Sequence, residues 1–242
     1  MKKFEISTVK YILLAAVMLT ISFNQVLVSQ IAKATGAKNI FNSMVSVITR
    51  SEEGGSGLGA RGGDLSTVDL GNIKSTAQGV AVIMAIDQIK TPEDAIKVML
   101  PTGVPDYGMA MGVSFDDPVA SLAILANAQK ALLAGLTPEQ KSRFIALASM
   151  PVGISCEFCC GVGPVGITSD GSSSCGCQHN PALLSVTMWL MQNTDYSDAE
   201  ILREVYRWKT LFFPKNMVDL ATKISGGDQS VLEELPGMVG GC

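Results

Sequence analysis

The residues best able to do chemistry lie in one stretch, "CEFCCGVGPVGITSDGSSSCGCQH", which holds five of the six cysteines and the single histidine of the chain. They are Cys156, Cys159, Cys160, Cys175, Cys177 and His179, spaced C-x2-C-C-x14-C-x-C-x-H. Thiolate sulfur and imidazole nitrogen are the ligands that soft and borderline metal ions prefer. The pattern C-x2-C-x15-C-x-C within this stretch is one residue short of a two-knuckle zinc site.

A metal centre is the first of three interpretations. Cysteines three residues apart in a tight turn converge on one side, and Cys175, Cys177 and His179 alternate, so that all three can face one side of an extended segment. The glycine- and serine-rich bridge between the two halves can bend back and bring them together. We expect zinc, with copper or an iron–sulfur cluster as alternatives that the spacing does not separate.

The other two interpretations use the same cysteines differently. An exported protein meets an oxidising compartment, and six cysteines would allow 15 disulfide pairings. The pair Cys156 and Cys159 also has the spacing of a thiol–disulfide redox motif, although no thioredoxin-like βαβ pattern surrounds it. Cys242 ends the chain, either as a free or intermolecular thiol or as a further ligand. No reaction can be assigned from these residues.

The N-terminus predicts a membrane segment. After a lysine-rich start, residues 11–32 carry no charge, and 22 residues are enough to cross a bilayer as a helix. The strongly apolar part ends at Phe23, and Ala32-Lys33-Ala34 also fits a signal-peptide cleavage site. We expect residues 1–35 to be a signal anchor, with a cleaved signal or a buried soluble helix as alternatives. The protein would then be a single-pass protein of the cell membrane with its bulk extracytoplasmic.

The rest of the chain predicts a mostly α fold, a helical domain that carries the Cys/His-rich irregular loop. Residues 36–67 indicate an interfacial helix and a glycine-rich linker, and residues 68–242 form the domain. Hydroxyl, carboxylate or amide caps at Thr91, Asp117, Thr137, Asn180 and Ser197 mark helix starts, four of them followed by proline. The predicted helices are 75–88, 92–100, 118–134, 138–149, 181–193, 198–211 and 216–225. Only "VGPVGIT" is compatible with a short strand.

Composition and charge narrow the function classes. The net charge is −4 and the 18 lysines and arginines are scattered singly, so we do not expect nucleic-acid binding. Hydrophobic residues make up 47% of the chain and charged residues 17%, which fits a membrane segment and a buried helical core. The aromatic cluster in "RWKTLFFP" is expected to pack against the cysteine loop, with a membrane surface or a protein partner as the alternative.

Several motifs together resemble a family of membrane-anchored archaeal proteins: "GISCEFCCG", "CGCQH", "EILREVYRWKTLFFP", "PTGVPDYG" and "VSFDDP". That family shares the signatures CxxCCG, CGCxH and WKxLFFP and a C-terminal GGC, and the similarity runs from about residue 65 to the C-terminus. The resemblance implies that the five clustered cysteines, His179 and Cys242 occupy signature positions. It implies no particular reaction.

Overall fold

The structure is a computed structural model that describes residues 65, 68–158 and 163–232, all of which belong to one unit of the chain, Ser56–Cys242. The predicted membrane segment at residues 11–32 lies outside the described residues and stays a prediction. Among the helices in the described ranges, none combines the length and apolar character needed to cross a bilayer.

The described residues are mostly helical, as the sequence predicts. The α-helices are α3 (Thr76–Ile83), α4 (Pro92–Met99), α5 (Gly108–Met111), α6 (Pro118–Gly135), α7 (Pro138–Ala148), α8 (His179–Asn193), α9 (Asp198–Phe212) and α10 (Pro214–Ser225). Short 3-10 helices are η1 (Leu70–Asn72), η2 (Ile86–Gln88) and η3 (Gln229–Leu232). Within these ranges the β structure amounts to an isolated antiparallel bridge between Ile167 and Ser173.

The predicted caps set most of the helix starts. Capping boxes begin three helices, with Thr91, Thr137 and Ser197 as the cap residues. The side chain of each cap accepts a hydrogen bond from the backbone N–H three residues later, and the side chain of that later residue accepts one from the backbone N–H of the cap. These capping boxes satisfy backbone donors that the first helical turn would otherwise leave unpaired. Asp117 likewise caps α6 by accepting from the N–H of Ala120.

Three predicted boundaries differ from the structure by more than one residue. The helix expected over 216–225 begins two residues earlier, at Pro214. The helix expected over 75–88 ends at Ile83, because the next three residues are all buried and the chain must turn to bury them. The helix expected from Pro181 begins at His179, and Asn180 lies within it instead of capping it. The side-chain amide of Asn180 bonds to the cysteine loop instead.

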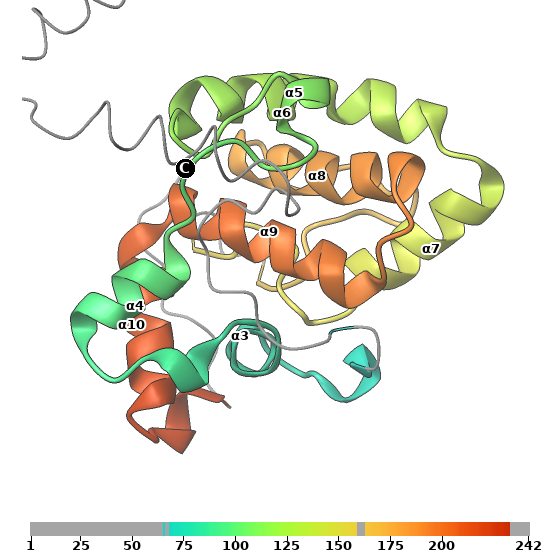
Figure 1. Cartoon of the computed structure of the whole chain (residues 1–242). Coiled ribbons are helices and arrows are strands. Elements are labelled where there is room, and N and C mark those ends of the chain that lie inside the picture. The colour runs from blue at the N-terminus through green and yellow to red at the C-terminus, as the bar shows by residue number, and fades with distance from the viewer. Residues whose placement is uncertain (1–64, 66–67, 159–162, 233–242) are drawn as a thin grey trace, which may run out of the picture. The chain divides into compact units, whose positions relative to one another are not determined.

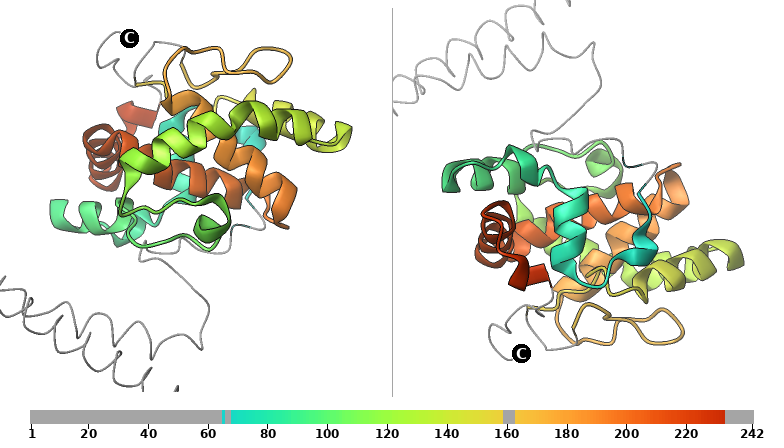
Figure 2. Two further views of the ribbon diagram at one scale, coloured as in Figure 1. Left: turned by 90° about the horizontal axis from the view of Figure 1, so that it is seen from above. Right: turned by 90° about the horizontal axis from the view of Figure 1, so that it is seen from below.

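Helix α8 lies at the centre of the domain. It packs against α6 and α7 on one side and α9 on the other, while α10 packs against α3, α4 and α9 (Figure 1). Residues Ala182–Met188 are all buried, as expected of a helix enclosed by neighbours on several sides. The loop that carries Cys175 and Cys177 runs along one edge of this helical body in both views of Figure 2.

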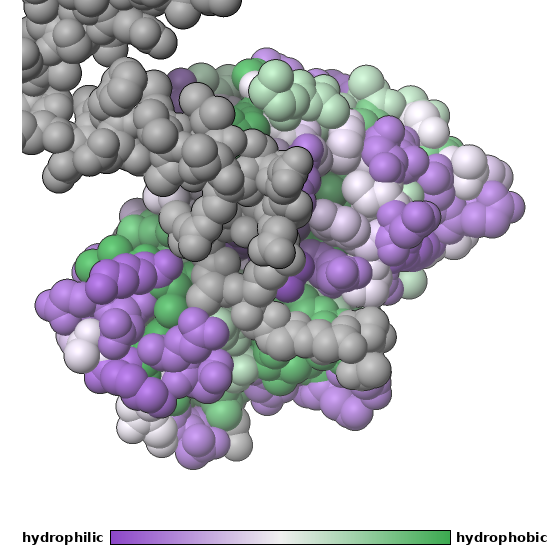
Figure 3. All heavy atoms as spheres, viewed as in Figure 1, coloured by the Kyte–Doolittle hydropathy of each residue, from purple (hydrophilic) through white to green (hydrophobic). Residues whose placement is uncertain are grey.

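The outer faces of the helices differ in character. Hydrophilic side chains cover α4 and α7, while the visible part of α6 carries paler, more apolar residues (Figure 3). On α6, Val119 is 79% exposed although it is apolar, whereas Leu125 is fully buried. The buried face of α6 is formed by Ser121, Leu125 and Gln129, because Ser121 is hydrogen-bonded to Ser114 in the preceding loop.

Candidate metal centre

Three of the predicted ligands come together in space. The sulfurs of Cys156, Cys175 and Cys177 all lie within 4.8 Å of one another. Cys177 is central, because its Sγ lies 3.3 Å from the Sγ of Cys156 and 3.3 Å from that of Cys175. The two halves of the motif, which are separated by the glycine- and serine-rich bridge, therefore converge as the sequence predicts.

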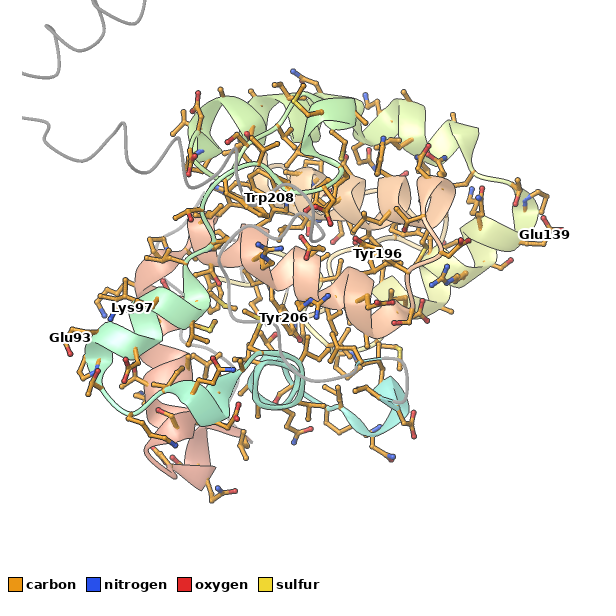
Figure 4. The ribbon with its side chains drawn as sticks, in the orientation of Figure 1. Glu93, Lys97, Glu139, Tyr196, Tyr206 and Trp208 are labelled. Atoms are coloured by element: carbon orange, nitrogen blue, oxygen red, sulfur yellow. The ribbon has the colours of Figure 1, made fainter. Side chains whose placement is uncertain are left out.

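The turn that carries Cys156 is held by helix α9. The hydroxyl of Tyr206 donates to the carbonyl oxygen of Val152 at 2.5 Å, and the ammonium of Lys209 donates to the carbonyl oxygen of Gly153. Tyr206 and its neighbour Trp208 lie on α9 (Figure 4), and both side chains are fully buried. The backbone just before Cys156 is thus fixed to a helix of the core at two successive carbonyls.

A buried ion pair also anchors this turn, directly beside the cysteine. Lys209 Nζ lies 2.9 Å from Glu157 Oε1, and Thr76 Oγ1 donates to the same oxygen at 2.5 Å. Neither charged side chain is exposed by more than 1%. Because each charge is costly to bury alone, the pair fixes the turn at Glu157 to both α9 and the start of α3.

The second half of the motif is held by the start of helix α8. Asn180 Nδ2 donates to the carbonyl oxygen of Gly166 at 2.6 Å and to Ser173 Oγ at 2.7 Å. These two acceptors lie on opposite arms of the loop, next to the bridge between Ile167 and Ser173. A single buried amide therefore closes the loop that leads to Cys175 and Cys177.

The side chain of His179 is hydrogen-bonded to Cys177, but His179 does not belong to the group of ligand atoms that lie within 4.8 Å of one another. Its ring centroid is 4.8 Å from that of Phe213 and 5.4 Å from that of Phe212. Its Nδ1 is buried and makes no hydrogen bond with the described residues. Phe213 also packs against Phe158 at 5.3 Å, so the aromatic segment contacts the cysteine loop as the sequence predicts.

The pKa values of Cys175 and Cys177 are shifted in opposite directions. A hydrogen bond with Cys156 is the largest cause that lowers the pKa of Cys177 to about 3, against the opposing effect of burial. Hydrogen bonds from the His179 side chain, the backbone N–H of Asn180 and the Cys175 thiol lower the pKa of Cys177 further. Burial is the main cause that raises the pKa of Cys175. Of these two thiols, Cys177 therefore ionises more readily than Cys175.

The spacing of the sulfurs fits a soft metal ion. Zn–S bonds of about 2.3 Å at tetrahedral angles place the ligand sulfurs about 3.8 Å apart. The two separations of 3.3 Å and the upper limit of 4.8 Å bracket that value. At these separations no disulfide joins the three cysteines to one another, since a disulfide bond is about 2.05 Å long. Cys159, Cys160 and Cys242 lie outside the described residues.

The residues that position the centre were missed from sequence. One feature of the sequence indicates that Lys209 is buried. It follows Leu202 by seven residues and Val205 by four, so it falls on the apolar stripe of α9. Glu157 stands between Cys156 and Phe158 in a stretch with no other charge. A lysine on an apolar stripe and a lone acid beside cysteines are compatible with a buried pair, but nothing local shows that the two meet.

The fold and the site together define a helical domain that presents a cluster of thiols from one irregular loop. Comparison with known protein families, with curated proteins and with solved structures finds no match to this chain. The assignment of function therefore rests on the geometry of the thiol cluster.

Proposed function

We propose that this protein binds a soft metal ion, zinc in the first place, through the thiolates of Cys156, Cys175 and Cys177. The observation that carries the proposal is the convergence of three sulfurs within 4.8 Å from two loop segments that different helices hold in place. Structural zinc sites use four protein ligands. Cys159, Cys160 and His179 are the proposed sources of the fourth.

The support around the sulfurs favours a site that is formed before the metal arrives. Metal ligands are usually oriented by hydrogen bonds from neighbouring groups. Here the Cys156 turn is tied to α9 through Lys209, and the Cys177 loop is tied to α8 through Asn180. Binding to a prearranged set of thiols costs little ordering of the chain, and it stabilises the folded state by mass action.

The proposed place of this domain is outside the cytoplasm, on a membrane anchor formed by residues 11–32. Clustered thiols in an oxidising compartment are prone to form disulfides. A bound soft metal ion keeps them as thiolates, so metal binding and export are compatible. The anchor and its orientation belong to the proposal and have their own test, protease accessibility of the domain in intact cells.

The direct test is elemental analysis of the full chain purified without oxygen. We expect stoichiometric zinc, which Cys177→Ser removes and Cys175→Ser weakens. Ser174→Ala is the matched control, because Ser174 neighbours Cys175 and its side chain is exposed. Replacement of zinc by Co²⁺ should give thiolate-to-metal charge-transfer absorption. Absence of stoichiometric metal in protein whose thiols are all reduced would refute the proposal.

A further inference from the structure

Among the three cysteines that the structure describes, Cys156 and Cys177 come from different segments and differ in their access to solvent. Cys156 Sγ lies 3.3 Å from Cys177 Sγ, and a disulfide between them requires the two atoms to approach by only about 1.3 Å. Cys156 is fully buried, whereas Cys177 is partly exposed. A molecule in solution can therefore reach Cys177 before it reaches Cys156, whose sulfur lies 3.3 Å from that of Cys177.

We propose that, when no metal is bound, the protein exchanges thiols with small disulfides, with Cys177 as the attacking thiol and Cys156 as the resolving thiol. This pair differs from the C-x-x-C pair that spacing alone suggests, because it joins the two ends of the loop motif. The proposal uses the same sulfurs as the proposed metal centre, but it does not rest on metal binding.

The exchange proceeds in two balanced steps. The thiolate of Cys177 attacks one sulfur of a disulfide R–S–S–R, which forms a mixed disulfide at Cys177 and releases one thiolate R–S⁻. The sulfur of Cys156 then attacks the sulfur of Cys177, and the proton of Cys156 passes to the leaving sulfur of the R group. The Cys156–Cys177 bond forms, the bond from Cys177 to the R–S group breaks, and the second R group leaves as R–SH. The first R–S⁻ takes a proton from water. The protein loses two electrons, and the small disulfide gains them as two thiols.

Cys175 offers a sulfur at the same distance from Cys177, but on the same short segment. A Cys175–Cys177 bond would close a small ring through two peptide units, each of which resists departure from planarity. Cys156 belongs to a separate turn, so a bond from it closes a large loop without that restriction. The geometry therefore favours Cys156 as the partner.

One consequence concerns the metal. A Cys156–Cys177 bond consumes two of the three clustered sulfurs, so oxidation and metal binding at this site exclude each other. Oxidation would release the metal, and bound metal would block the exchange. We expect the zinc-loaded chain to react with a small disulfide at least about tenfold more slowly than the metal-free chain.

The test treats the reduced, metal-free full chain with oxidised glutathione and maps the products by mass spectrometry. Cleavage by chymotrypsin after Phe158 separates Cys156 from the other four clustered cysteines. We expect a crosslink between Cys156 and Cys177 in the wild type and in Cys175→Ser. Cys156→Ser should retain glutathione on Cys177, and Cys177→Ser should form no crosslink to Cys156.

Several outcomes would overturn the proposal: a wild-type crosslink from Cys156 to Cys159 or Cys160, or glutathione retained on Cys175 in Cys156→Ser. The wild-type map decides the pairing even if Cys156→Ser fails to fold, which circular dichroism would reveal. Metal content is measured separately on reduced protein. Zinc without exchange refutes only this inference, and exchange without zinc refutes only the proposed function.

Discussion

Lys209 Nζ lies 2.9 Å from Glu157 Oε1, and this ion pair joins the middle of α9 to the residue that follows Cys156. The ammonium also donates to the carbonyl oxygen of Gly153 and lies 5.7 Å from the centroid of the Phe158 ring. One buried side chain thus contacts three residues of the cysteine turn. A buried ion pair contributes little net free energy to folding, because burying both charges is costly. Removing one partner is nevertheless strongly destabilising, because the other charge is then buried without a partner.

We expect Lys209→Met to destabilise the domain by about 3–5 kcal/mol, because it leaves the Glu157 carboxylate buried without a counter-ion. Urea unfolding followed by circular dichroism measures the loss. The double variant Lys209→Met with Glu157→Gln should recover part of it, since no charge then remains buried.

The exposed pair formed by Lys215 and Asp219 provides the matched control. Their side chains are 87% and 56% exposed, so Lys215→Met should change stability by less than about 1 kcal/mol. Equal effects of the two lysine substitutions would contradict a special role for Lys209. Lys209→Arg keeps the charge but not the shape, and it tests whether the fit of the ammonium matters.

Alanine substitutions at two glycines of the cysteine loop, Gly166 and Gly176, should have different effects on stability and metal binding. A Cβ at Gly166 would lie 2.5 Å from Asn180 Oδ1 and 2.6 Å from Ser155 Cβ, whereas a Cβ at Gly176 meets nothing within 4 Å. Gly166→Ala must therefore displace Asn180 or the neighbouring turn, and we expect a loss of about 1–3 kcal/mol together with weaker metal binding.

Gly176→Ala is the control for this prediction, and a demanding one, because Gly176 lies between Cys175 and Cys177. It should leave the unfolding midpoint and the metal affinity nearly unchanged. Competition with a chromophoric chelator measures the affinity. A larger effect at Gly176 than at Gly166 would mean that the loop is not held as the structure shows.

His179 tests the extent of the ligand set. We expect His179→Ala to weaken metal retention, because the imidazole is one of the proposed ligands. The helix content should stay nearly unchanged, because the substitution removes the ring contacts with Phe212 and Phe213 and no backbone hydrogen bond of a helix. The measurement is zinc content after dialysis against a chelator. His179→Phe preserves the aromatic packing without a nitrogen, so retention by this variant would remove the histidine from the proposed ligands.

The helix starts could be predicted from sequence because their causes are local. Thr91, Thr137 and Ser197 each cap a helix within three residues of themselves. The convergence of the two cysteine segments was predictable in outline, since a short flexible bridge joins them. These are the parts of the fold in which the residues that interact are also close along the chain.

The support of the site could not be predicted, because it depends on contacts between distant residues. Asn180 has the sequence context of a helix cap. Its side-chain amide instead donates hydrogen bonds to Gly166 and Ser173 and so holds the two arms of the loop together. Lys209 and Glu157 are 52 residues apart, and neither one alone identifies the other. Local propensity is overridden at these positions by the need to satisfy buried polar groups.

The lowered pKa of Cys177 gives a prediction about reactivity in the metal-free, reduced protein. With a pKa of about 3, Cys177 stays a thiolate from pH 8 down to pH 5, so its alkylation by iodoacetamide should vary little over that interval. A thiol with the ordinary pKa of 9.0 loses about tenfold in thiolate for each unit of pH, or about 1000-fold in all.

Because a thiolate of low pKa is also a weaker nucleophile, the absolute rate at pH 8 is not diagnostic, whereas the flat profile is. Cys175, whose pKa is raised, should lose reactivity as the pH falls below 8. Alkylation of the two residues can be followed by peptide mapping. In urea both should show the ordinary steep dependence, since unfolding removes the hydrogen bond from Cys156 that stabilises the Cys177 thiolate. A steep profile for Cys177 in the folded protein would contradict the geometry of the cluster.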